Sequence, residues 1–170
     1  ATQNGKWQVG AVIYKEVAEP APAPEYLHSL IDNVTPARLE MTFSLVLTNI
    51  LPPTSSFSVT VNGTSRSVSA VSVSGTSVLL TLSSPVSCGD RITVAYTKPS
   101  TNPLQTAAGG QAESFSARNV TNNVAPPLPV LVSVVVENAS PSAMVLTYNM
   151  SLASIVPAAS AFAVKVNSTA

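Results

Sequence analysis

The chain has 170 residues, of which 45% are hydrophobic and only 9% are charged. This length and apolar share predict a folded protein with a substantial core, because disordered chains contain fewer apolar residues and more charged ones. Eight lysines plus arginines balance eight aspartates plus glutamates and are scattered along the chain. The clustered cations of a nucleic-acid-binding surface are therefore missing, and nucleic acid is excluded as a partner.

Three further classes are excluded by simple counts. No apolar run approaches the roughly 18 residues of a membrane span. The single cysteine, Cys88, excludes an intrachain disulfide scaffold and a four-cysteine zinc site. The first residues lack the basic-then-apolar pattern of a signal peptide. If the protein is exported, we expect the signal elsewhere in a longer polypeptide, or assembly into a particle.

The chain opens with a strand-like run, Trp7 to Val17. We interpret residues 1–19 as the last strand of a preceding domain. Residues 20–27 begin with alternating prolines and are predicted to be a linker, because proline fixes φ and favours an extended, semi-rigid backbone.

Residues 28–124 are predicted to form one domain of short strands. After an opening strand near Leu30 to Val34, apolar residues alternate with mostly polar ones over residues 39–47 and 57–61. This period of two is typical of strands with one buried face. Asn62-Gly63 then supplies the positive φ angles of a tight hairpin turn.

The second half of this domain continues the pattern. A strand is predicted over residues 66–74, with a bulge or bend after Val68 where the alternation changes phase. Strands follow over residues 78–82, 92–96 and 115–120, and a long loop from Lys98 to Gln111 precedes the last of them.

About seven strands result, which is typical of an all-β fold, the immunoglobulin-like antiparallel β-sandwich. The alternation predicts ten buried side chains: Met41, Phe43, Leu45, Phe57, Val59, Val61, Leu80, Leu82, Val94 and Phe115.

An internal repeat indicates that this domain is one of a tandem series. Residues 33–65 align without a gap on residues 138–170, at an offset of 105 residues, and 12 of the 33 pairs are identical. A period near 100 residues suits an immunoglobulin-like domain and is too long for a solenoid unit.

Residues 125–130 form a second proline-rich linker, and residues 131–170 are predicted to be the incomplete N-terminal part of a second repeat. Its strands are expected at Leu131–Val136, Met144–Leu152 and Phe162–Asn167. Three strands expose an apolar stripe unless something covers it. We expect the natural chain to continue and supply the missing strands, or another chain to donate them.

No residue set predicts catalysis, a metal or a cofactor. His28, the only histidine, lies at a predicted linker junction, sixty residues from Cys88, whereas a nucleophile usually needs a nearby base. The acidic residues form no Asp-x-Asp cluster of the kind that binds calcium. We therefore expect no enzyme activity in this segment.

The long loop is the most plausible contact surface, because loops on a sandwich carry recognition. The candidate contact residues are Lys98, Asn102, Leu104, Gln105 and Gln111. The alternative is a spacer packed against the next repeat. Trp7, Tyr14 and Tyr26 could stack on sugars, although core or interdomain packing is the simpler interpretation.

Several motifs together resemble a known family. They are Phe57-Ser-Val-Thr-Val-Asn-Gly-Thr64, Gly89-Asp-Arg-Ile-Thr-Val-Ala-Tyr-Thr-Lys-Pro99 and Thr101-Asn-Pro-Leu-Gln105. Residues 28–124, and 131–170 in part, resemble the SwmB-type repeat, an Ig-like module named for a cyanobacterial surface protein of swimming motility. Similar repeats occur in structural proteins of gut phages. The family has no shared catalytic residues.

The resemblance implies a non-enzymatic structural or interaction module. The first hypothesis is a phage virion surface protein of the fibre or capsid-decoration type. Its expected partners are other virion or surface proteins, host or mucosal glycans, and further copies of itself. The alternatives are a module of a bacterial cell-surface adhesin or motility protein, and an accessory domain of a secreted glycan-degrading or proteolytic enzyme.

Overall fold

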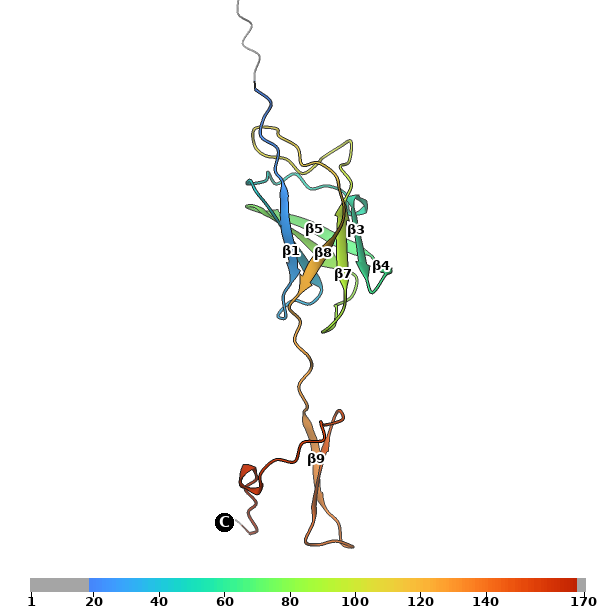
Figure 1. The fold of residues 1–170 in the computed structure, drawn as a ribbon, viewed down its shortest axis with the longest axis vertical. Helices are drawn as coiled ribbons and strands as arrows, with labels where there is room; N and C mark the ends of the chain where they lie inside the picture. Colours follow the sequence, from blue (N-terminus) through green and yellow to red (C-terminus); the bar gives the residue numbers. More distant parts are fainter. Residues whose placement is uncertain (1–18, 168–170) are drawn as a thin grey trace, which may run out of the picture. The chain divides into compact units, whose positions relative to one another are not determined.

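Figure 1 shows the computed structural model of the chain, which describes residues 19–167. The chain divides into two compact units, the first ending at Ala125 and the second beginning at Pro126, and each is described by itself. The run from Trp7 to Val17 lies outside the described residues. No helix in residues 19–167 is long and apolar enough to cross a membrane. The regular structure there consists of strands and two short 3-10 turns, which confirms the all-β prediction.

The first unit contains eight strands and the 3-10 turn η1 (Thr54–Ser56). The strands are β1 (Tyr26–Ile31), β2 (Arg38–Phe43), β3 (Phe57–Val61), β4 (Thr64–Arg66), β5 (Val68–Ser74), β6 (Ser77–Leu82), β7 (Ile92–Tyr96) and β8 (Phe115–Asn122). They form one sheet in the order β4-β3-β7-β8-β1-β2-β6-β5. Neighbouring strands are antiparallel except β1 and β8, which pair in parallel.

This sheet curls around a single core. Buried side chains of β2 and β6 belong to the same apolar cluster as those of β3 and β7, so strands from the two ends of the sheet order cover the same interior. Of the ten side chains predicted to be buried, eight are buried, whereas Leu45 and Phe115 are half-buried. The period-2 pattern therefore located the core faces of β2, β3, β6 and β7 correctly.

The opening strand lies earlier than predicted. It ends at Ile31 because the Asp32 carboxylate accepts a hydrogen bond from the Val34 N–H at 2.7 Å, a side-chain turn that competes with strand pairing. Its other end reaches back to Tyr26. The predicted linker over residues 20–27 is therefore too long, and His28 lies in β1 rather than at a linker junction.

β2 ends earlier than predicted, and β5 contains the predicted bulge. β2 stops at Phe43, where the Ser44 N–H donates to the Glu25 carbonyl at 2.8 Å, so Leu45 lies outside the strand. The register of β5 against β6 shifts between Val68 and Ala70, as the change of phase in the sequence predicted. Asn62-Gly63 adopts φ angles of 51° and 81°, which confirms the hairpin turn between β3 and β4.

The second unit contains the antiparallel strands β9 (Leu131–Val136) and β10 (Met144–Tyr148) and the 3-10 turn η2 (Ala159–Ala161). Two predictions were wrong here. β10 ends at Tyr148 rather than Leu152, and residues 162–165 belong to no strand. A strand from Phe162 needs a neighbour with which to pair, and β3, its counterpart in the first unit, pairs with β4 and β7.

The elements of the second unit match those at the start of the first unit at the offset of 105 residues. The pair Ile31↔Leu39 in β1–β2 corresponds to Val136↔Met144 in β9–β10, and both hairpins shift register near their open ends. η2 likewise corresponds to η1. Asn167 has a φ of 51°, as Asn62 does. The sequence repeat is thus also a repeat of local structure.

Candidate functional site

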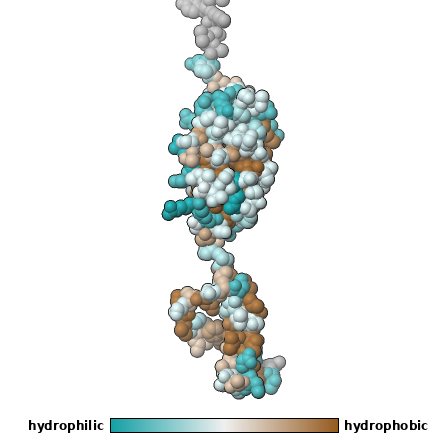
Figure 2. Space-filling view, turned by 90° about the vertical axis from the view of Figure 1, so that its right-hand side faces the viewer, coloured by the Kyte–Doolittle hydropathy of each residue, from teal (hydrophilic) through white to brown (hydrophobic). Residues whose placement is uncertain are grey.

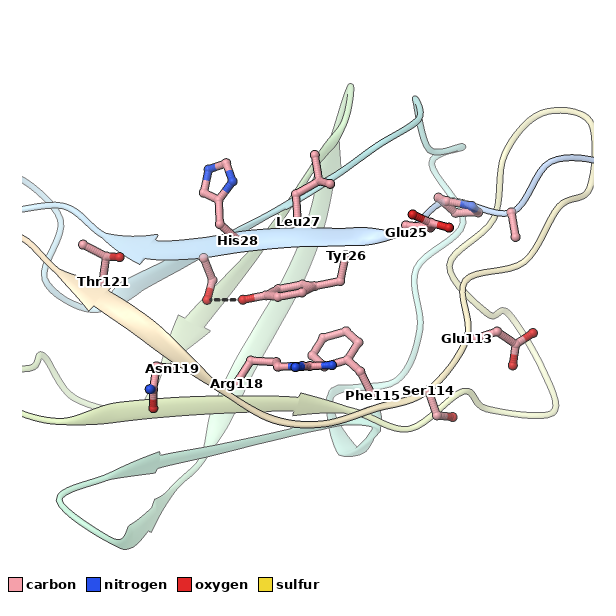
Figure 3. A pocket seen from close by; sticks show the side chains of 13 residues that line it. Glu25, Tyr26, Leu27, His28, Glu113, Ser114, Phe115, Arg118, Asn119 and Thr121 are labelled. Atoms are coloured by element: carbon pink, nitrogen blue, oxygen red, sulfur yellow. Dashed lines mark hydrogen bonds between the residues drawn. The ribbon is translucent and has the colours of Figure 1, made fainter.

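A groove of about 710 Å³ lies between β1 and β8 (Figure 3). The parallel pairing of these strands covers Leu30↔Thr121 and Ile31↔Asn122, at the C-terminal ends of both. From there the two strands diverge toward Tyr26 and Phe115 (Figure 3). The groove is the space between the diverging segments.

Irregular strand pairing explains why β1 and β8 separate. The register of β1 against β2 shifts between Tyr26 and His28. The register of β8 against β7 shifts between Val94 and Tyr96, next to Phe115. An extra residue bends the strand that carries it and increases its twist. Both strands are thus bent at the end where the groove is open.

Two aromatic rings form the floor of the groove. The rings of Tyr26 and Phe115 lie 4.5 Å apart between centroids, at 33° to each other. The Tyr26 ring also meets Phe43 edge-on at 6.1 Å, and Phe115 meets Tyr96 at 6.0 Å. The Tyr26 hydroxyl is 2.8 Å from the Ser29 hydroxyl. The floor is therefore a fixed extension of the core.

Charged and amide side chains surround this floor (Figure 3). Glu25 and Glu113 flank the open end, whereas Arg118 and Asn119 project from β8 farther along. His28 is exposed on β1, so it is solvated as expected although it does not lie in a linker. Glu113 forms a salt bridge of 3.1 Å with Lys98.

The predicted contact loop is folded onto the unit. Leu104 is fully buried, and its N–H donates to the Tyr96 hydroxyl at 3.0 Å. Burial raises the pKa of Tyr96, an effect that this hydrogen bond partly opposes, so the phenol stays protonated at neutral pH. The Gln105 carbonyl accepts from the Thr48 N–H at 2.8 Å, and Gln105 forms a bridge with Gln111.

These contacts divide the five candidate contact residues into one core residue and four residues that are exposed or half-buried. Leu104 is a core residue and cannot reach a partner, so its assignment was wrong. Asn102 is exposed, with a φ of 53°, and Lys98, Gln105 and Gln111 are half-buried. For these four, a contact role stays a prediction.

The turn around Cys88 is held by hydrogen bonds to Asp90. The Ser87 N–H and the Asn62 side-chain amide each donate to this carboxylate at 2.7 Å. These two bonds, in that order, lower the pKa of Asp90. Cys88 itself is exposed. In residues 19–167, no three His, Cys, Asp or Glu side chains come together in a way that could hold a metal ion.

Sequence reasoning missed the groove. Tyr26 was placed in the predicted linker and Phe115 at the start of the closing strand, and their contact joins residues 89 positions apart. The alternation that finds buried faces gives no information on where two parallel strands separate, because the separation depends on bulges in two strands. No signal in the sequence would have located it.

The first unit carries a match to a repeat family. Residues 23–101 match the family described as a putative flagellar system-associated repeat. The match confirms the resemblance to the SwmB-type repeat. It covers residues through β7 and ends within the loop that precedes β8. No curated protein matches the chain.

Solved structures of a bacterial S-layer protein, SbsC, are similar to this chain. For its domains 1–6 the identity is 24%, with a TM-score of 0.50, over 67% of this chain and 15% of that one. For its N-terminal part the identity is again 24%, with a TM-score of 0.48, over 66% of this chain and 26% of that one. The chain therefore spans a small part of the length of those proteins, and the likeness shows the fold alone.

Proposed function

We propose that this chain is a non-enzymatic repeat module of a bacterial surface-associated protein, built from tandem Ig-like β-sandwiches. The match of residues 23–101 to a putative flagellar system-associated repeat family carries this proposal. It favours the bacterial alternative over the virion hypothesis, because the matched family is described by its association with a flagellar system.

The matching hairpin registers support the tandem arrangement. β1–β2 and β9–β10 share register, bulge position and spacing to the following 3-10 turn at one constant offset. Two unrelated domains have no reason to agree in all three features. Repeated domains joined by proline-rich segments suit a spacer that projects from a surface.

The curled eight-stranded sheet supports the interpretation as an Ig-like sandwich. β1 and β8 join the two halves of the sheet order by a short parallel pairing, while apolar side chains of both halves share one core. Such a domain uses its loops and strand edges for contacts and leaves its interior closed.

The absence of catalysis remains part of the proposal. Cys88 lies in the turn between β6 and β7 and His28 on β1, and no hydrogen bond joins them within residues 19–167. We expect the purified chain to show no hydrolase or transferase turnover. Turnover that disappears in Cys88→Ala or His28→Ala would overturn this part.

Localisation tests the proposal directly. Antibodies raised against residues 19–125 are applied to intact cells that carry the gene, and to phage particles purified from the same culture. We expect immunogold label on the cell surface, removable by external protease. Label confined to the particles would establish the virion alternative instead, and copurification with a secreted hydrolase would establish the accessory-domain alternative.

A further inference from the structure

We propose that the groove between β1 and β8 binds an extended segment of another polypeptide, which adds as a strand between them. The segment has an apolar side chain over the Tyr26–Phe115 pair, a cationic side chain near Glu25 and an acidic one near Arg118. This inference goes beyond the proposed function and does not depend on where the protein resides.

The facing strand edges supply the main argument. Within residues 19–167, residues 26–29 pair with β2 and with no residue of β8, and residues 115–119 pair with β7 and with no residue of β1. Two strand edges thus face each other across the groove. Backbone N–H and C=O groups are strong donors and acceptors, and an open edge is a template for strand addition.

The groove has the size of a short strand. With strands about 4.8 Å apart, sheets about 10 Å apart and a rise of about 3.4 Å per residue, one strand residue fills roughly 160 Å³. A volume of about 710 Å³ therefore accommodates about four residues. That length matches residues 26–29 of β1, which pair with β2 but not with β8.

The rim defines the side chains of the ligand. Glu25 lies at the open end of the groove and Arg118 farther along β8 (Figure 3). Neither side chain has a hydrogen bond or an ion pair within residues 19–167, whereas the neighbouring Glu113 is paired with Lys98. An extended segment can therefore pair with Glu25 and Arg118 without breaking an existing contact.

The aromatic floor favours a peptide over a sugar. One face of the Tyr26 ring is covered by Phe115 at 4.5 Å, and Phe43 meets the same ring edge-on. A sugar needs an open ring face on which to stack. An aliphatic or aromatic side chain needs only an apolar surface, which the half-buried pair provides.

A titration of the full chain with designed peptides tests the proposal. The probe is a nine-residue peptide of alternating valine and threonine, with lysine near one end and glutamate at the centre. A second peptide has these two charges exchanged. Backbone amide resonances of the isotope-labelled chain are followed by NMR. We expect shifts confined to residues 25–31 and 113–122, and tighter binding of the first peptide.

Charge reversal provides the sharpest arm. Arg118→Glu should lower the affinity for the first peptide by roughly fivefold, the scale of an exposed ion pair. It should raise the affinity for the charge-exchanged peptide. Arg38→Glu is the matched control, because Arg38 is exposed on β2 and does not line the groove; it should change neither affinity. Methylation of alternate peptide nitrogens should abolish binding, since it removes strand hydrogen bonds and keeps the side chains.

Four results of these titrations would overturn the proposal, and a fifth comes from the chain alone. They are shifts that map outside the groove, no response to Arg118→Glu, full binding by the methylated peptide, and no peptide binding while a neutral chitin hexasaccharide shifts the same amides. The last result would make the groove a sugar site. If the same amides shifted when the chain alone was concentrated, the groove would bind a second copy of this chain. That result would likewise overturn the proposal that it binds a segment of another polypeptide.

Discussion

The two units begin with the same elements but differ in how much of their apolar surface they bury. Leu39 is fully buried, whereas its counterpart Met144 is 41% exposed. Phe57 is 6% exposed and Phe162 is 51% exposed. The hydrophobic colour of Figure 2 is accordingly extensive over the second unit. Identical or similar side chains in one register thus have opposite environments.

This comparison separates local from long-range determinants of the fold. Both units have the same hairpin register, the same 3-10 turn and an asparagine with a positive φ angle. A segment of about forty residues therefore encodes these features. Burial occurs only where β6, β7 and β8 are present among the described residues. A core side chain contributes roughly 1.5–3 kcal/mol when buried, so most of the stability resides in the first unit.

The largest expected difference is in amide protection. In the 170-residue chain, core amides of β2, β6 and β7 should exchange roughly a thousandfold or more slowly than those of β9 and β10. The reason is that the former open only by global unfolding, whereas an isolated hairpin is marginally stable. Hydrogen exchange followed by NMR or mass spectrometry measures the ratio. Equal protection in a monomer would show that the second unit buries its apolar face in some other way.

A matched pair of substitutions tests the same contrast at one position. Phe57→Ala should destabilise the first unit by about 3–5 kcal/mol. The change removes a buried ring whose centroid lies 5.3 Å from that of the Tyr96 ring. Phe162→Ala, the equivalent change, should alter stability by less than about 0.5 kcal/mol. Denaturant unfolding followed by fluorescence or circular dichroism measures both. Similar losses in the two variants would contradict the difference in burial.

The proline-rich segment before β1 belongs to the first unit. A substitution at Gly110 tests whether this segment is packed against the loop that precedes β8. A Cβ at Gly110 would lie 2.0 Å from the Pro22 carbonyl oxygen, and backbone atoms cannot move aside by changing rotamer. Gly110→Ala should therefore cost about 1–3 kcal/mol, measured by thermal unfolding. Ala107→Gly, an exposed change in the same loop, is the control and should have little effect. Unchanged stability in Gly110→Ala would mean that residues 20–24 are not packed there.

Sequence periodicity predicted the parts of the fold that depend on one strand at a time. Alternation identified the buried faces of β3, β6 and β7, and Asn62-Gly63 identified the hairpin turn. Strand ends were less predictable, because they depend on contacts such as the Asp32 side chain with the Val34 N–H and the Ser44 N–H with Glu25. Each such contact competes with backbone hydrogen bonding between strands at one residue, and alternation in the sequence does not report it.

The candidate site shows the same limit more strongly. The sequence identified the loop from Lys98 to Gln111 but could not show that Leu104 completes the core through its hydrogen bond with Tyr96. The groove was unpredictable because it arises where two bulged strands separate. Its floor pairs Tyr26 with Phe115, and no period in the sequence links those positions.

The smallest expected effect concerns Asp90, which lies before β7 in a region without a counterpart among the described residues of the second unit. Hydrogen bonds from the Ser87 N–H and the Asn62 amide lower the pKa of its carboxyl below the ordinary 3.8. The folded state therefore favours the ionised form. This contribution to stability is present above about pH 3.8 and is lost as the pH falls through the lower pKa of the folded state.

Asp90→Asn should accordingly lower the Tm of the first unit slightly at neutral pH, and the difference from the unchanged chain should shrink as the pH falls through the pKa of the folded-state carboxyl. The effect is small because the carboxylate is exposed to solvent. Thermal unfolding of both proteins between pH 7 and pH 2 measures it, while amide exchange in β9 and β10 should be the same in both. A difference in Tm that persisted at pH 2 would show that Asp90 acts through turn geometry rather than through its charge, because an uncharged carboxyl would then stabilise the turn equally well.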